Sequence, residues 1–203
     1  MNVRRPADKL ANRVRAFNII KAKSYAEGDY VLASGKRSKY YLDMKPTMFD
    51  PDGANLLANL VMDCIEQLNA RVDMVGGVAM GAVPLVSAVT LLSVTKPKKL
   101  PGFVVRKGAK DHGTMKLIES AEDLAGKNVL ILEDVTTSGG SAMLAVDAAR
   151  NAGANIVLVL AIIDREEGAA DLYGSKGIAF KSLFRLSEFR QASAQPPRCC
   201  LLY

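Results

Sequence analysis

The segment of this sequence best suited to chemistry combines two carboxylates, several hydroxyls and two glycines. Its residues, in order, are Glu133, Asp134, Val135, Thr136, Thr137, Ser138, Gly139, Gly140 and Ser141. Glycines let consecutive backbone N–H groups point toward one ligand and hydroxyls add donors, so these residues favour a bound phosphate group. Carboxylates repel phosphate but accept hydrogen bonds from vicinal sugar hydroxyls. The pattern therefore predicts a site for a phosphorylated sugar, whereas an ordinary polar loop would not require two adjacent acids.

The sequence on either side of this segment would position it at the edge of a sheet. The branched apolar run 129–132 predicts a strand that is buried on both faces. Residues 141–150 predict a helix packed closely on that sheet, and the positive end of its dipole would favour phosphate. Neither the Gly-Lys-Ser/Thr of a Walker loop nor a G-x-G-x-x-G dinucleotide turn is present.

A second candidate is the cationic run from Arg106 to Lys116. It contains four formal cations, His112 and two glycines, and it lacks apolar periodicity. A segment of this kind is expected to be an exposed loop. Such a loop can be a solvated surface, or it can close over phosphoryl groups as mobile cationic loops of enzymes do.

Both segments resemble those of type I phosphoribosyltransferases, and in particular those of the orotate phosphoribosyltransferase family. Segment 133–141 is similar to the family's motif for phosphoribosyl pyrophosphate (PRPP). The resemblance implies that Glu133 and Asp134 face the ribose hydroxyls and that residues 136–141 surround the 5-phosphate.

The cationic run closely resembles the catalytic loop of the same family. The matching residues are Arg106, Lys107, Lys110, His112 and Gly113. The resemblance implies that these residues are catalytic: Lys107, Lys110, His112 and Asp134. It implies PRPP contacts from a larger set, namely Arg106, Lys107, Lys110, His112, Glu133, Asp134, Val135, Thr136, Thr137, Ser138, Gly139, Gly140 and Ser141. In that family the loop crosses a dimer interface, so we expect a homodimer in which 106–116 is shared between the subunits.

Residues 30–45 predict a hairpin whose turn is Ser34-Gly35-Lys36. The pattern Ser34-Gly35-x-x-Ser38-x-Tyr40-Tyr41-x-Asp43-x-Lys45 is similar to the hood that covers the base in orotate phosphoribosyltransferases. Ala33 stands where some family members carry a lysine, so that contact is not expected. The resemblance implies orotate contacts from Tyr40, Tyr41, Thr137 and Arg165.

Arg165 comes directly after the apolar run 155–164, which is expected to be a central strand. By resemblance it lies where the family places an arginine on the orotate carboxylate, and a planar guanidinium suits that group. Pairing with Glu166 or Glu167 is the alternative role.

Strands and helices alternate between residues 51 and 163, which predicts an α/β fold with helices on both faces of a parallel sheet. The expected strands are 72–77, 102–106, 129–132, 155–164 and 178–186. The expected helices are 8–23, 51–69, 141–150 and one that ends near residue 93. The resemblance implies a doubly wound sheet and one phosphoribosyltransferase domain over 1–203. Its core would be about 51–186, and a small N-terminal hood would comprise about 1–48 plus a C-terminal segment.

Glycines 76, 77 and 81 mark a tight turn at the carboxyl end of the expected strand 72–77. Open α/β sheets bind ligands at that edge. By resemblance this is the loop on the pyrophosphate side, and a plain βα connection is the alternative.

Composition excludes several other classes of protein. The 203 residues include one histidine and three cysteines, which fit neither a His-rich metal site nor a disulfide framework. No apolar run approaches the ~20 residues of a membrane span, and the N-terminus lacks the apolar region of a secretory signal, so a cytoplasmic location is expected. The net charge of +6 suits a small polyanion better than nucleic acid, since aromatic residues make up only 6% and Trp is absent.

The resemblance implies transfer of ribose 5-phosphate from PRPP to orotate, giving orotidine 5′-phosphate and pyrophosphate in pyrimidine biosynthesis. Mg²⁺ is the expected cofactor, held mainly by PRPP oxygens and not directly by protein ligands. Two alternatives stay open: a non-catalytic sensor of PRPP or a nucleobase, and a sister phosphoribosyltransferase that takes another base. No nucleic acid or membrane partner is expected.

Overall fold

The computed structural model describes residues 6–31, 35, 37–108 and 117–191. Within these residues, six strands form a sheet in the order β5-β4-β3-β6-β7-β8. They are β3 (Met74–Val78), β4 (Gly102–Val105), β5 (Ile118–Ser120), β6 (Asn128–Thr136), β7 (Asn155–Asp164) and β8 (Phe180–Arg185). Neighbouring strands are parallel except β4 and β5, which are antiparallel. The expected parallel sheet is therefore confirmed, with an antiparallel edge strand that the sequence pattern did not predict.

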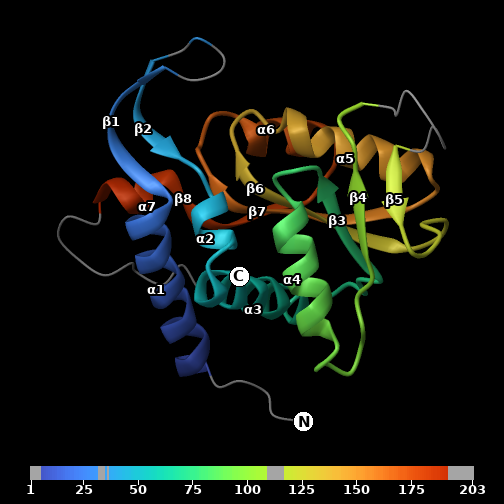
Figure 1. The fold of residues 1–203 in the computed structure, drawn as a ribbon. Coiled ribbons are helices and arrows are strands. Elements are labelled where there is room, and N and C mark those ends of the chain that lie inside the picture. The colour runs from blue at the N-terminus through green and yellow to red at the C-terminus, as the bar shows by residue number, and fades with distance from the viewer. Residues whose placement is uncertain (1–5, 32–34, 36, 109–116, 192–203) are drawn as a thin grey trace.

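Helices cover both faces of this sheet (Figure 1). They are α1 (Pro6–Lys23), α2 (Lys45–Met48), α3 (Pro51–Glu66), α4 (Val83–Ser93), α5 (Gly140–Asn151), α6 (Ala169–Ser175) and α7 (Leu186–Gln191). Buried side chains of α1, α3 and α4 cluster with Leu130 and Leu132, whereas those of α5 and α6 cluster with Val129 and Ile131. Because side chains alternate between the faces of a strand, the apolar run of β6 contributes to both clusters. The doubly wound arrangement is confirmed.

The expected hairpin is a separate two-stranded antiparallel sheet of β1 (Tyr25–Val31) and β2 (Arg37–Leu42). In α1, which precedes it, Phe17 stacks on Phe189 of α7 with 4.4 Å between ring centroids. The Tyr25 ring of β1 lies 5.6 Å from the same Phe189 ring. The first helix, the hairpin and the helix after the last strand therefore pack together (Figure 1). The division of the chain into hood and core stays a prediction.

Several element boundaries differ from those expected. β6 continues through Glu133 to Thr136, beyond the expected end at residue 132, because its carboxyl-terminal half pairs with β7. The two acids therefore lie inside a strand and not after it. Leu186, expected to end the last strand, begins α7, and the short helices α2 and α6 were not expected. No helix within the described parts of the chain has both the length and the apolar character needed to cross a membrane.

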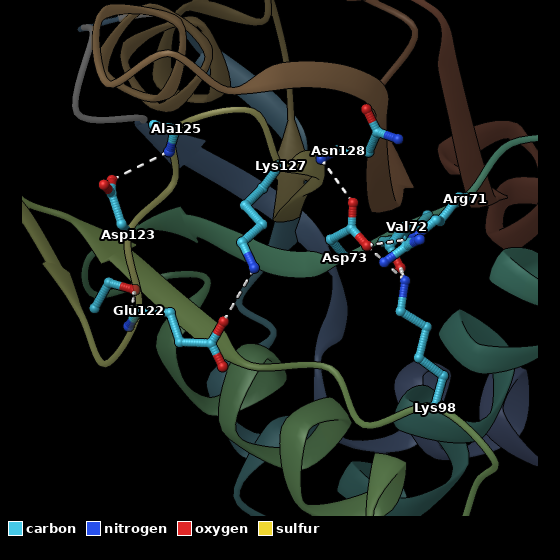
Figure 2. Close-up of polar contacts among 10 residues, drawn as sticks. Arg71, Val72, Asp73, Lys98, Glu122, Asp123, Ala125, Lys127 and Asn128 are labelled. Carbon is cyan, nitrogen blue, oxygen red and sulfur yellow. Dashed lines mark hydrogen bonds and ion pairs between the residues drawn. The ribbon is translucent and has the colours of Figure 1, made fainter.

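The Asp73 carboxylate joins three segments at the amino-terminal edge of the sheet, as Figure 2 shows. It accepts hydrogen bonds from Arg71 Nε at 2.7 Å, from Lys98 Nζ at 2.7 Å and from the Asn128 N–H at 3.0 Å. The hydrogen bond from Lys98 contributes most to holding the pKa of Asp73 well below its usual range, against the opposing effect of burial. Asp73 thus ties the start of β3 to the start of β6 and to the segment before β4.

We expect Asp73→Ala to lower the free energy of unfolding at neutral pH by about 2–3 kcal/mol, because it removes charge-assisted hydrogen bonds and leaves the Asn128 N–H unpaired. The folded pKa of Asp73 lies below its unfolded value of about 3.9, so this stabilisation is complete above that value, declines below it and is lost as the pH falls through the folded pKa. Urea titrations should show a larger difference between variant and wild type at about pH 7 than at about pH 3.5.

The matched control for Asp73→Ala is Glu122→Ala at the same edge of the sheet (Figure 2). Glu122 pairs with Lys127 at 3.4 Å, and its side chain is 48% exposed. Its loss should change the free energy of unfolding by less than about 0.5 kcal/mol. Equal differences for Asp73→Ala at both pH values would contradict the assigned charge interaction.

Candidate active site

The candidate site lies where β3, β6 and β7 end side by side at the carboxyl edge of the sheet. β6 pairs with β3 on one side and with β7 on the other, and Thr136 is in register with Asp164. Beyond β7, the Arg165 N–H donates to the Thr136 carbonyl at 2.9 Å. Ligand sites of open α/β sheets form at this edge because loops from neighbouring parallel strands meet there.

The end of β6 and the loop into α5 line a cavity of about 260 Å³. The lining residues are Glu133, Val135, Thr136, Thr137, Ser138, Gly139, Gly140 and Ser141. All of them belong to the segment expected to bind PRPP, and the structure brings them around one space at the start of α5. Their individual contacts with PRPP stay predictions.

Gly139 at the start of α5 occupies a position that a larger residue would disturb. Its φ of 87° is left-handed, and a Cβ atom there would lie 2.9 Å from the Tyr173 ring. The Tyr173 hydroxyl in α6 donates to the Gly139 carbonyl at 3.1 Å. The loop is therefore held against α6, which preserves the open cavity and leaves the start of α5 facing it.

Glu133 is a buried carboxyl group with an unused acceptor. Glu133 belongs to β6 and is 7% exposed. Its Oε2 has no hydrogen-bond partner among the described residues. Burial, reinforced by the neighbouring Asp134, raises the pKa of Glu133 to about 8, while Lys107 acts in the opposite direction. A buried polar atom without a partner is costly unless a ligand satisfies it, so this carboxyl suits hydroxyl donors such as those of a sugar.

Asp134 is half-buried and lies against the glycine-rich turn that follows β3. A Cβ atom on Gly81 would lie 2.8 Å from Asp134 Oδ1, and one on Gly77 would lie 2.3 Å from the Leu132 carbonyl oxygen. At Gly77 of β3 only glycine allows this approach to the β6 backbone, and at Gly81 a larger residue would press on the Asp134 carboxylate. The structure therefore brings the expected pyrophosphate-side loop and the acidic pair together.

Of the cationic residues expected at the site, the structure describes Arg106 and Lys107, which have different partners. Lys107 is close enough to Glu133 to act on its pKa. Arg106 forms an ion pair with Glu119 of β5, with 3.0 Å between its Nη2 and Oε1 of the acid. Lys110 and His112 lie outside the described residues. The start of the expected catalytic loop therefore lies near the acidic pair through Lys107, whereas Arg106 pairs with the edge strand β5.

Arg165 connects the end of β7 to the hairpin. Its side chain is 10% exposed, and Nη2 donates to Ser38 Oγ of β2 at 3.4 Å. Nε forms an ion pair with Glu167 Oε1 at 2.9 Å. The pairing with a nearby glutamate that the sequence left open therefore occurs, and Nη2 faces the hairpin.

The two expected base-contacting tyrosines do not share a face of β2. Tyr40 is partly buried, like Ser38, and stacks on Tyr25 with 6.0 Å between ring centroids. Tyr41 is 46% exposed, and its ring lies 5.4 Å from that of Tyr30. Adjacent residues of a strand point to opposite sides, so only the Tyr40 ring lies on the Ser38 side with Arg165.

Lys45 is a further charged residue near the acids to which the sequence assigned no role. Its Nζ donates to Asp43 Oδ1 at 2.8 Å, and this bond is the main cause of its raised pKa. The negative charge of Asp134 and the nearby Tyr41 add to the same effect. The signal was its place in the motif that resembles the hood, two residues after Asp43.

Together these residues form a site with three chemically distinct parts. The loop into α5 offers N–H and hydroxyl donors to a phosphate, and Glu133 with Asp134 offers acceptors to sugar hydroxyls. Arg165, at the neighbouring strand end, offers a guanidinium to an anionic group. This arrangement suits a phosphorylated sugar whose reacting carbon faces an anionic partner held under the hairpin.

Comparisons with known proteins agree with this arrangement. The family model for the phosphoribosyl transferase domain matches residues 48–182. The orotate phosphoribosyltransferase of Bradyrhizobium diazoefficiens is 48% identical over 187 residues, covering 91% of this chain and 99% of that protein. That of Rhodopseudomonas palustris is 48% identical over 184 residues, covering 89% and 97%.

Solved structures show the same likeness. The orotate phosphoribosyltransferase of Mycobacterium tuberculosis in complex with inorganic phosphate has a TM-score of 0.76 at 28% identity, covering 89% of this chain and 99% of that chain. The same enzyme in complex with PRPP has a TM-score of 0.70 at 25% identity, covering 87% and 90%. The fold, the site and these relatives show that the chain belongs to the orotate phosphoribosyltransferase family.

Proposed function

We propose that this protein joins N1 of orotate to C1 of the PRPP ribose, releasing pyrophosphate and forming orotidine 5′-phosphate in pyrimidine biosynthesis. The observation that carries the proposal is the acidic pair of β6 beside the cavity at the start of α5, with Arg165 at the next strand end. Relatives that are named for this activity match most of the chain.

The arrangement accounts for the demands of the reaction. Departure of pyrophosphate leaves positive charge on the ribose, as in glycoside transfer. Glu133 and Asp134 would hold the ribose hydroxyls and favour that charge, while Lys107 and the loop that follows it would stabilise the negative leaving group. Arg165 would hold the orotate carboxylate. Orotate carries its negative charge on the carboxylate and a proton on N1, which is lost as the N1–C1 bond forms and is taken up by solvent or by the departing pyrophosphate.

Glu133 provides a test of ribose binding. Because burial raises the pKa of Glu133 to about 8, most of this carboxyl is protonated near neutral pH in the free protein. Hydroxyl donors favour the carboxylate, so PRPP binding should release on the order of half a proton per site at about pH 7.5, and affinity should increase as the pH rises toward the pKa.

Calorimetry in two buffers of different ionisation enthalpy measures that proton release. Glu133→Gln should remove most of it, whereas Glu122→Gln at the opposite edge of the sheet should leave it unchanged. The comparison with wild type cancels any protons released by PRPP itself. Equal release from wild type and Glu133→Gln would show that Glu133 does not change protonation on binding.

We propose that Mg²⁺ is held mainly by PRPP oxygens. Neighbouring carboxylates are suitable hard donors, with Asp134 the more accessible of the two. Within the described residues, however, no group of three or more His, Cys, Asp or Glu side chains could hold a metal ion. When bound, Mg²⁺ would neutralise negative charge on the leaving pyrophosphate, and the protein would orient the ribose.

We also propose a homodimer in which the loop 106–116 contributes to the neighbouring subunit's site. Exposed apolar side chains on α4 and directly after it support an interface, since Leu91 is 75% and Val94 61% exposed. A mixture of Lys110→Ala and Asp134→Ala subunits, each inactive alone, is expected to recover about a quarter of wild-type activity if sites combine at random. Heterodimers that form and remain inactive would contradict loop sharing.

An ultraviolet assay with PRPP and Mg²⁺ tests the proposed reaction. Orotate, uracil and hypoxanthine are compared with a control without base, and pyrophosphate release is measured in parallel. Consumption of orotate with one pyrophosphate per turnover is the expected result. Consumption of another base alone would leave the PRPP site in place and refute the assignment of orotate. PRPP binding without turnover would favour a sensor. A cytoplasmic location stays a prediction.

A further inference from the structure

Glu166, which directly follows Arg165, adopts a backbone conformation that is rare for its residue type. Its φ is 62°, and it is the one non-glycine among the described residues with a positive φ. Its N–H donates to Asp164 Oδ1 at 2.8 Å, which helps to hold this turn. Left-handed backbone outside glycine persists where surrounding contacts determine it. We therefore expect a side-chain contact of Glu166 that holds this conformation.

The Glu166 side chain bonds the turn to the C-terminal helix. Its Oε2 accepts a hydrogen bond from the Ser187 N–H in the first turn of α7, at 3.0 Å. α7 in turn contacts the N-terminal part of the chain at several points, among them the ion pair of Glu188 with Arg13 at 2.7 Å. The Phe189 ring stacks on Phe17 at 4.4 Å, and the Arg190 guanidinium lies 5.1 Å from the centre of the Tyr40 ring. Glu166 thus connects the Arg165 turn to the helix that supports the hairpin.

These contacts link Arg165, the hairpin and α7 to one another around the part of the site assigned to orotate. Arg165 reaches from the turn to Ser38 of β2, and Arg190 reaches from α7 to Tyr40 on the same strand. Ser38 and Tyr40 lie two residues apart, so their side chains share one face of β2. The bond from Ser187 to Glu166 completes the connection between α7 and the turn. This bond is a direct link between α7 and the Arg165 turn, and it acts beside the Arg13–Glu188 ion pair and the Phe17–Phe189 stack that hold α7 to α1.

The charges around Arg165 lead to the same conclusion. Two acids follow it, and a carboxylate on its guanidinium competes with an anionic ligand. Glu167 Oε1 lies 2.9 Å from Nε as an ion-pair partner but accepts no hydrogen bond from it, whereas Glu166 accepts the N–H of Ser187 in α7. We propose that Glu166 is a positioning residue for the anionic base: its bond to Ser187 holds α7, and through α7 the hairpin, against Arg165. This inference rests on the proposed function, since it assigns the base to Arg165.

Steady-state kinetics of Glu166→Ala and Glu166→Gln test this role. Glu166→Ala should raise the orotate KM about three- to tenfold, the effect of losing one charge-assisted hydrogen bond, with kcat and the PRPP KM within about twofold of wild type. Glu166→Gln should stay within about twofold in all three, because its amide oxygen can accept the same bond. Glu122→Ala, far from the site, is the control.

The outcomes separate this inference from the proposed function. A wild-type protein that consumes no orotate would refute both. With an active wild type, three results would overturn the inference alone: an orotate KM of Glu166→Ala no higher than that of Glu122→Ala, an equal rise in the PRPP KM, or equal impairment of Glu166→Gln. Melting temperatures would reveal a general loss of stability in Glu166→Ala. Such a loss alone would leave the orotate KM of the folded fraction unchanged, unlike the loss of a positioning residue.

Discussion

Replacing Lys110 with alanine is expected to lower kcat by about two to three orders of magnitude, while orotate binding changes less than about threefold. The difference arises because the negative charge that Lys110 would meet develops on pyrophosphate mainly in the transition state. A cation that acts there stabilises the transition state more than the bound substrates, so its loss lowers turnover selectively.

Lys110 lies outside the described residues, and its role is predicted from the resemblance of the cationic run to the family's catalytic loop. Lys107 acts on the pKa of Glu133, so the described end of the loop lies near the acidic pair. Lys110 is three residues further along the chain, which limits the separation of the two Cα atoms to about 11 Å. This chain distance is compatible with the predicted role of Lys110 at the leaving pyrophosphate, in its own subunit or in its partner.

Steady-state kinetics and orotate binding of Lys110→Ala check this prediction. Lys116→Ala is the matched control, because it removes the same charge from the same cationic run and has no assigned role. It should keep kcat within about threefold of wild type, since Lys116 is not among the residues assigned to PRPP or to the leaving group. Similar losses in turnover and in orotate affinity for Lys110→Ala would instead make Lys110 a residue of ground-state binding.

Arg165→Ala should raise the orotate KM about 30- to 100-fold. A bidentate guanidinium–carboxylate contact involves two charge-assisted hydrogen bonds. Part of that energy is offset because Arg165 is already paired with Glu167 at 2.9 Å, and orotate must compete with this partner. A net loss of about 2–3 kcal/mol corresponds to the expected change. Arg165→Lys should be intermediate, because an ammonium lacks the planar fork.

Comparing the KM for orotate with the KM for PRPP distinguishes a loss of base binding from a general loss of substrate binding. The PRPP KM of Arg165→Ala should stay within about threefold of wild type, because Arg165 is assigned to the base and the phosphate loop is intact. Arg150→Ala, an exposed arginine on α5, is the control for loss of one positive charge. An orotate KM for Arg165→Ala equal to that of the control would leave Arg165 with a structural role, as the partner of Glu167 and Ser38.

The sequence by itself determined those features that depend on neighbouring residues. The strand, loop and helix that include Glu133 to Ser141 are continuous in the chain, so their apolar pattern, hydroxyls and glycines sufficed to predict one cavity at the start of α5. The alternation of apolar segments likewise predicted the parallel sheet, because its strands are buried on both faces and its helices on one.

Only the tertiary structure decided features that depend on distant contacts. Pairing with β7 extends β6 through both acids, and burial in that sheet raises the pKa of Glu133 to about 8. The contact of Arg165 with Ser38 spans 127 positions of sequence, and no local pattern specifies such a pair. The strand geometry of β2 separates the Tyr40 and Tyr41 rings, although the resemblance had implied orotate contacts from both.

The C-terminal helix shows the same division. Its sequence predicted a short helix at most, and a helix of this length gains its stability from packing and not from local propensity. Phe189, Ser187 and Arg190 give it partners in α1, in the Arg165 turn and in the hairpin. Sequence thus named the candidate residues for the chemistry, and tertiary packing decided which of the described ones meet, because contacts between distant segments form only when the sheet and its helices assemble.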